Sequence, residues 1–171
     1  MPDAAEHLDR LEAAHQLTPR WAGSRFAWVK TLLPAHKGKL GEQLFDQLCE
    51  AGGVALVGEN GPGHDRRTAG HKVEIKLSTL YATADPDDAG YKWLQLRPED
   101  DYDLVVLIGI EPDRVHVWAV DKTAALVHSR GQHGGKDAAE TRMIELGEHD
   151  RPAWLGADLA DDPGRFAAAV A

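Results

Sequence analysis

Apolar residues along the chain recur at helical spacing in some stretches and at every second position in others. The segment "KGKLGEQLFDQLCEAGG" places Leu40, Leu44, Phe45 and Leu48 on one stripe and stops at two glycines, which predicts a helix with a glycine C-cap. Three other helices are predicted at about residues 4–16, 21–33 and 161–171, and a short one after Lys122.

Strands are predicted where the period changes to two or where the chain is apolar throughout. "HKVEIKL" sets Val73, Ile75 and Leu77 against Lys72, Glu74 and Lys76, the alternation of a strand with one buried face. "LVVLIGI" (104–110) and "RVHVWAV" (114–120), separated by "EPD", predict a hairpin whose second strand alternates Val115, Val117 and Ala119 against His116 and Trp118. "VALVGE" (54–59) and "TRMIEL" (141–146) are two further predicted strands.

This order of elements predicts an α/β (α+β) fold with a central mixed β-sheet flanked by helices. The chain has 171 residues, of which 43% are hydrophobic, enough for one globular domain with a core. We therefore expect a single domain over 1–171. Its N-terminal helices occupy about 1–35, and a C-terminal extension occupies about 121–171.

Composition limits where the protein acts. No apolar run approaches a membrane span and the N-terminus lacks the pattern of a signal peptide, so we expect a cytoplasmic protein without membrane contact. The single cysteine, Cys49, lies on an apolar helical stripe and is predicted to be part of the core.

The charge is unevenly distributed. A net charge of −9 argues against a protein that coats nucleic acid non-specifically. Nevertheless, no acid occurs between Glu12 and Glu42, while five cations accumulate there, and a second acid-free window follows Asp121. The sequence allows either one basic face or ordinary solvated surface charge.

The pair Glu74 and Lys76 is the candidate chemistry. Two residues apart on a strand, both side chains point to one face, and the loop "PGHD" brings Asp65 close upstream. Clustered carboxylates repel each other unless a cation lies between them, and such oxygen-rich sites suit Mg²⁺. An acid two positions before a lysine is expected about once by chance in such a chain, so the context carries the interpretation. The alternative is a solvated salt-bridge ladder on a surface strand.

In order, "GEQLFDQL", "PGHD" and "VEIKLS" resemble the PD-(D/E)XK nuclease superfamily, over roughly Lys37 to Val120. The resemblance implies a restriction endonuclease-like fold. The resemblance implies that Asp65, Glu74 and the carbonyl of Ile75 bind Mg²⁺, for which Mn²⁺ substitutes. Glu42 is then expected to hold a second ion or its water, and Lys76 to position or activate the attacking water. The implied reaction is phosphodiester hydrolysis.

DNA contacts are expected from residues near this cluster and from the basic windows. Gln95 and Arg97 in "WLQLR", which also resembles the family, are expected to face the cleft and hold a phosphate, although Arg97 could instead pair with the acids at 99–103. His64 is expected to support Asp65 or to act as scaffold. The other candidate DNA contacts are Arg66, Lys37, Lys39, His133 and Lys136.

The resemblance implies a Mg²⁺-dependent DNA endonuclease of the type II restriction or defence kind, acting as a homodimer or with a partner subunit. A structure-selective nuclease, such as a junction resolvase or repair enzyme, is the first alternative. A non-catalytic DNA-binding or partner subunit on the same fold is a second, and an RNA-directed nuclease is a third.

Overall fold

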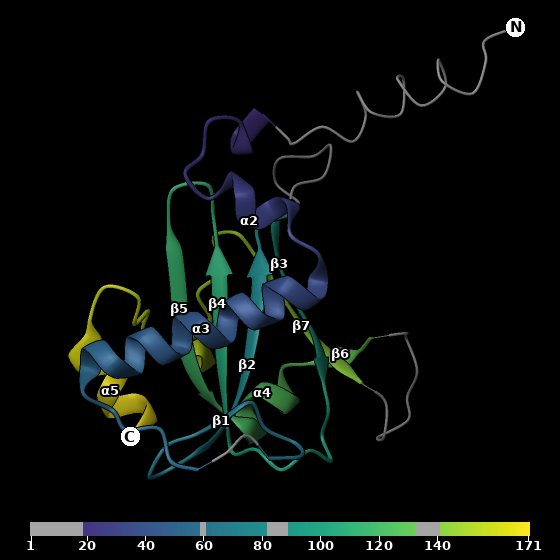
Figure 1. Cartoon of the computed structure of the whole chain (residues 1–171). Coiled ribbons are helices and arrows are strands. Elements are labelled where there is room, and N and C mark those ends of the chain that lie inside the picture. Colours follow the sequence, from purple (N-terminus) through teal and green to yellow (C-terminus); the bar gives the residue numbers. More distant parts are fainter. Residues whose placement is uncertain (1–18, 59–60, 82–88, 133–140) are drawn as a thin grey trace, which may run out of the picture.

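The computed structural model describes residues 19–58, 61–81, 89–132 and 141–171 (Figure 1). Its elements, in chain order, are η1 (Pro19–Trp21), α2 (Ala27–Thr31), α3 (Pro34–Gly52), β1 (Arg66–Arg67), β2 (Lys72–Thr79), β3 (Gly90–Leu96), β4 (Leu104–Ile110), β5 (Val115–Asp121), α4 (Lys122–Val127), β6 (Arg130–Gly131), β7 (Arg142–Gly147), η3 (Ala153–Leu155) and α5 (Pro163–Val170).

These strands form two sheets. The larger has the order β1-β2-β4-β5, with β2 parallel to β4 and the other two pairs antiparallel. The smaller is antiparallel, with the order β3-β7-β6. The predicted α+β class with a mixed sheet is confirmed, although the strands divide between two sheets.

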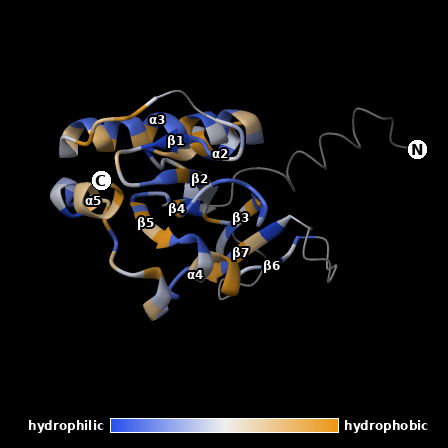
Figure 2. Ribbon diagram, turned by 90° about the horizontal axis from the view of Figure 1, so that it is seen from below, coloured by the Kyte–Doolittle hydropathy of each residue, from blue (hydrophilic) through white to orange (hydrophobic). Residues whose placement is uncertain are grey.

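The helix α3 and the smaller sheet cover opposite faces of the larger sheet. Figure 2 shows α3 on one side of β2 and β4, and β3, β7 and α4 on the other side. The strand β4 lies in the middle and is buried along its whole length, which explains why it is apolar at every position. The edge between α3 and β3, where β2 is the outermost long strand, is where the candidate site lies.

Local sequence explains how α3 reaches the sheet. Pro34 opens the helix at a position where its missing N–H costs nothing, and Gly53 closes it in the left-handed conformation with φ 72°. Gly41 faces β2, where a Cβ atom would lie 3.2 Å from the Cβ of Leu77. The small residue therefore lets the helix lie close against the strand that carries Glu74 and Lys76.

Aromatic side chains fill the space between the two sheets. Tyr91 stacks on Trp93 with ring centroids 5.3 Å apart, and Trp118 meets Trp93 edge-on at 6.0 Å. All three side chains are fully buried, at 1% exposure or less. Burial of this much aromatic surface stabilises the contact between the sheets and so fixes β3 relative to β2.

Several predicted elements are confirmed. The hairpin of β4 and β5, the strands β2 and β7, the short helix α4 and the C-terminal helix α5 all occur as expected. The burial of β2 does not alternate as expected, because Glu74 and Ser78 are buried along with Val73 and Ile75. Cys49 is buried, as predicted. The helix expected at about 4–16 lies outside the described residues.

Three predictions are wrong. "VALVGE" is not a strand over its described part: Leu56 and Val57 are exposed, the N–H of Val54 donates to the carbonyl of Cys49 at the end of α3, and the N–H of Val57 donates to the carbonyl of Arg67. The helix expected at 21–33 is limited to α2, since a turn precedes it. The spacing of seven residues between Trp21 and Trp28 predicts a shared core stripe, but Trp21 is buried and Trp28 is 53% exposed.

The face of β5 that carries His116 and Trp118 is buried. His116 is buried, its Nδ1 lies 2.5 Å from Asp158 and its Nε2 lies 3.0 Å from Glu111. Tyr91 donates a hydrogen bond to the same Glu111 oxygen at 2.6 Å. This buried network ties the C-terminal segment to β5.

Within the described part of the chain, no helix is both long and apolar enough to cross a membrane.

Candidate active site

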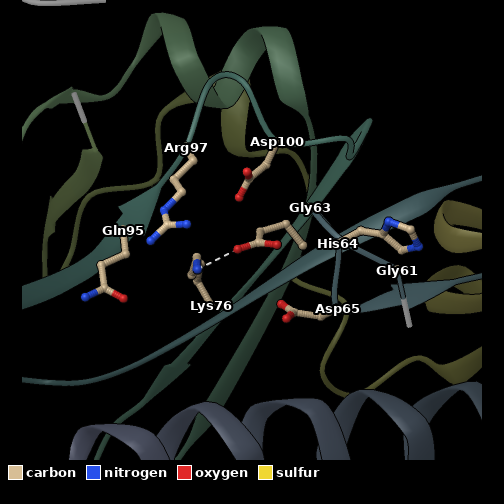
Figure 3. Close-up of a pocket in the computed structure, with 9 residues that line it drawn as sticks. Gly61, Gly63, His64, Asp65, Lys76, Gln95, Arg97 and Asp100 are labelled. Carbon is tan, nitrogen blue, oxygen red and sulfur yellow. Dashed lines mark ion pairs between the residues drawn. The ribbon is translucent and has the colours of Figure 1, made fainter. Parts of the chain in front are cut away.

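A polar pocket of about 270 Å³ lies where the loop before β1, the strand β2 and the loop after β3 meet (Figure 3). Its lining contains three of the predicted catalytic residues and both predicted phosphate-binding residues of the "WLQLR" segment. The lining residues are Gly61, Gly63, His64, Asp65, Glu74, Lys76, Gln95, Arg97 and Asp100.

The backbone holds Asp65 beside β2 in two ways. The N–H of Asp65 donates to the carbonyl of Val73 at 2.9 Å, and the N–H of Ile75 donates to Asp65 Oδ2 at 2.8 Å. Gly63 allows the loop to approach, since its φ is 91° and a Cβ atom would lie 2.5 Å from the backbone nitrogen of Asp101. The carboxylate is thus fixed at the edge of β2, as the sequence predicted.

The same bond gives the direction of the Ile75 carbonyl. In a strand, the N–H and C=O of one residue point toward the same neighbour. Because the Ile75 N–H points to Asp65, its carbonyl points to the same open edge. The three predicted oxygen donors, on Asp65, Glu74 and Ile75, therefore come from adjacent positions.

Glu74 and Lys76 form an ion pair inside the pocket. Lys76 Nζ lies 2.6 Å from Glu74 Oε1, and the side chains are 19% and 9% exposed. Burial raises the pKa of Glu74, Lys76 partly offsets this effect, and the charge of Asp65 raises this pKa further. The lysine thus compensates only part of the cost of ionising this carboxylate.

The pKa of Asp65 is raised as well. Burial raises its pKa, although the hydrogen bond from Ile75 and the charge of Lys76 oppose this effect. The charge of Glu42 also raises the pKa of Asp65. A buried and a part-buried carboxylate that are both costly to ionise are a donor set that a divalent cation would stabilise. Among the described residues, no three His, Cys, Asp or Glu side chains converge as a metal-binding group, so this set has two carboxylates.

Arg66 does not occupy the position expected of a DNA contact. It is 8% exposed, and its guanidinium donates to both carboxylate oxygens of Asp46, at 2.6 and 2.9 Å, to Glu42 at 3.0 Å and to the carbonyl of Asp65 at 2.7 Å. Its hydrogen bonds therefore point into the protein, and Arg66 fastens the Asp65 loop to α3. The sequence did not reveal Asp46 as its partner.

Glu42 lies in the neighbouring groove on the α3 side, not in the pocket itself. Its Oε2 accepts hydrogen bonds from Arg66 at 3.0 Å and from Lys39 at 3.1 Å. Lys39 is thereby engaged by Glu42, with a side chain that is 61% exposed.

Gln95 and Arg97 both reach the pocket, but simple alternation does not bring them there. The pairing of β3 with β7 shifts between Trp93 and Leu96, and Gln95 has a φ of 61°. Bulges of this kind commonly redirect side chains next to active sites. Figure 3 shows Arg97 pointing toward Lys76, and no acid within the described ranges forms an ion pair with Arg97.

Sequence reasoning missed Asp100. In Figure 3 its carboxylate enters the pocket from the side opposite Asp65. The charge of Asp100 contributes to the raised pKa of Glu74. The acidic run at 99–103 is a sequence signal for it, but the sequence offers that run only as an alternative partner for Arg97.

His64 lines the pocket, but its ring points away from Lys76 in Figure 3. Its Nδ1 is buried without a hydrogen-bond partner among the described residues. Lys37 lies in the groove beside the pocket. His133 and Lys136, the other predicted DNA contacts, lie outside the described residues.

Comparison with known family models and with curated proteins finds no match. Among solved structures, the chain is similar to that of a bacterial homing endonuclease, I-Ssp6803I, with a TM-score of 0.49 and 16% sequence identity. The similarity covers 74% of this chain and 86% of that chain. At this score and identity, no residue role is transferred from that protein.

Proposed function

We propose that the protein is a DNA endonuclease that hydrolyses phosphodiester bonds with the help of Mg²⁺, or of Mn²⁺ in its place. The main support is one pocket that combines Asp65, Glu74 and Lys76 with the guanidinium of Arg97, which forms no ion pair with a described acid. Oxygen donors for a hard cation thus lie next to donors for a phosphate. The resemblance to the PD-(D/E)XK superfamily agrees with this arrangement.

The ligands in this proposal are the carboxylates of Asp65 and Glu74 and the carbonyl of Ile75. Their chemistry fits the ion, because burial makes both carboxylates costly to ionise without added positive charge. When bound, Mg²⁺ offsets phosphate charge and increases the acidity of water.

Lys76, Arg97 and Gln95 act on the substrate. Lys76 donates a hydrogen bond to the attacking water or to a phosphate oxygen, where negative charge increases during the reaction. Arg97 presents the forked donors that bind phosphate through two hydrogen bonds. Gln95, redirected by the bulge, binds a neighbouring phosphate or sugar.

Glu42 acts in this proposal mainly through Arg66. It holds the guanidinium that in turn donates to the carbonyl of Asp65, which makes Glu42 a positioning residue. A direct role for Glu42 at a second ion stays a prediction.

Cleavage of both strands of DNA requires two such sites, so we propose a homodimer or a partner subunit as the active form. A restriction or defence role is one biological setting for this activity. A structure-selective role is favoured by the groove described below.

The experiment is conversion of supercoiled plasmid to nicked or linear forms, with Mg²⁺, with Mn²⁺ and with a chelator. The wild-type protein should cut only with a divalent ion, and Asp65→Ala should abolish cutting while far-UV circular dichroism stays unchanged. Divalent ions should also raise the melting temperature of the wild type. Absence of both cutting and metal stabilisation would support the non-catalytic DNA-binding alternative.

A further inference from the structure

A second hollow of about 610 Å³ continues from the pocket along the edge of β2. It shares Asp65, Lys76 and Gln95 with the pocket, so the two form one continuous groove. We call this second part the lysine groove. It lies between the N-terminal half of α3 and β3, and its cations are Lys30, Lys37, Lys76 and Lys92.

Among the described residues, two of these lysines form hydrogen bonds to carbonyl groups and no ion pair. Lys30 Nζ donates to the carbonyl of Leu80 at 2.8 Å, and Lys37 Nζ donates to the carbonyl of Lys30 at 3.2 Å. Neither forms an ion pair with an acid in the described segments. Burial lowers the pKa of both, and the charge of Lys37 lowers the pKa of Lys30 further. The fold thus keeps two cations together at a cost that an anion in the groove would remove.

One side of the groove is the edge of β2, which no described strand covers beyond Val73. β1 pairs with β2 only at Lys72 and Val73, and β4 occupies the opposite edge. The backbone groups of Leu77 and Thr79 point in the same direction as those of Ile75, away from β4, because alternate residues of a strand share a direction. Backbone N–H groups along this edge of β2 therefore add hydrogen-bond donors to those of the lysines.

Apolar and aromatic side chains complete the lining. Leu94 is 43% exposed, and the ring of Tyr81 lies beneath Lys92, whose Nζ is 4.4 Å from the ring centroid. Cations for phosphates combined with apolar surface for bases are typical of single-stranded nucleic-acid sites. A volume of about 610 Å³ is comparable to that of small-molecule sites of about 300–1,000 Å³. It is therefore suited to a short piece of one strand, since a duplex is much wider.

We propose that the lysine groove holds unpaired nucleotides of the cleaved strand, next to the phosphate at Asp65 and Lys76. The substrate class that follows is DNA with a single-stranded segment at the cut. Lys30 and Lys37 bind its phosphates, and Leu94 contacts a base. The assignment of the cut position rests on the proposed function, but binding to the groove does not.

The test measures binding of a labelled single-stranded oligonucleotide and of the matching blunt duplex by fluorescence anisotropy, in chelator and at several salt concentrations. Lys30→Gln and Lys37→Gln should each weaken single-strand binding about fivefold at low salt, as loss of one ion pair predicts. Each should also reduce the slope of log affinity against log salt by about 0.7, the value per phosphate of a single strand.

Leu94→Asn should weaken binding about threefold and leave this slope unchanged, because it removes apolar contact without charge. Arg165→Gln, on the exposed surface of α5, is the matched control for loss of a cation and should bind as the wild type does. Melting temperatures show whether Lys30→Gln folds as the wild type does. If it does not, Lys37→Gln alone tests the proposal.

Unchanged affinity and slope in Lys37→Gln would overturn the proposal, as would tighter binding of blunt duplex that no groove variant affects. Self-association of Lys37→Gln with normal DNA binding would instead show that the lysines protect an open strand edge. Groove-dependent binding by a wild type that never cuts would leave the groove assignment intact and contradict the nuclease proposal alone.

Discussion

Arg66 gives the sharpest test of how the site is held together. Replacing it with methionine removes four hydrogen bonds, two to Asp46 and one each to Glu42 and the carbonyl of Asp65. Removing one partner of a buried ion pair costs about 3–5 kcal/mol. The side chains of Asp46 and Glu42 are 35% and 23% exposed, so water can partly rehydrate them. We therefore expect a loss of about 2–3 kcal/mol in the free energy of unfolding.

This loss corresponds to a decrease in melting temperature of roughly 5–10 °C for a chain of this size. Urea unfolding followed by the fluorescence of the five tryptophans measures it directly. Arg67→Met is the matched control, because Arg67 is the exposed neighbour on β1 and its loss should change stability by less than about 0.5 kcal/mol. Equal stability of the two variants, together with a lower salt slope of DNA binding in Arg66→Met, would refute the structural role and restore the DNA contact.

Three further predictions follow from perturbed groups. Burial raises the pKa of Cys49 to about 11, so a thiol reagent at pH 8 should modify the native protein about a hundredfold more slowly than the unfolded chain; equal rates would contradict its burial. Burial raises the pKa of Asp65 in the folded state, so ionisation of this carboxyl lowers the free energy of unfolding as the pH rises above the unfolded-state pKa. Without metal at pH 7.5, Asp65→Asn should therefore be at least as stable as the wild type. In thermal melts, Mg²⁺ should raise the melting temperature of this variant less than that of the wild type. Burial opposes ionisation of Asp158, but His116 and backbone N–H groups outweigh it and lower the pKa; stability should therefore fall as pH decreases through the folded-state pKa, and His116→Asn should flatten that fall in urea midpoints.

The sequence correctly predicted the elements whose pattern of apolar and polar residues fits only one type of secondary structure. The run at 104–110, the turn "EPD" and the following strand form a local hairpin, so neighbouring residues contain all the information. "VALVGE" is also largely apolar, but Leu56 and Val57 are exposed and the segment forms no strand over its described part, so apolar composition alone does not place a segment in a sheet.

Long-range contacts limited the prediction of the site. Asp65, Glu74 and Lys76 lie close in sequence, so alternation and a short loop were enough to place them together. The roles of Arg66 and Asp100 depend on where α3 and the loop after β3 pack, which no local pattern contains. The lysine groove likewise combines residues of α2, α3 and β3. Of Lys30 and Lys37, its two lysines without an ion pair among the described residues, the sequence predicted only Lys37 as a DNA contact.

The most direct test of the central claim compares metal-dependent plasmid cleavage by the wild type, Lys76→Met and Lys72→Met. Both lysines lie on β2, and Lys72 pairs at 2.6 Å with Asp101, whose side chain is 68% exposed, whereas Lys76 pairs with buried Glu74 inside the pocket. We expect Lys76→Met to lose cleavage while Lys72→Met cuts as the wild type does, with both variants folded. Undiminished cleavage by folded Lys76→Met would contradict the assignment of this pocket as the active site.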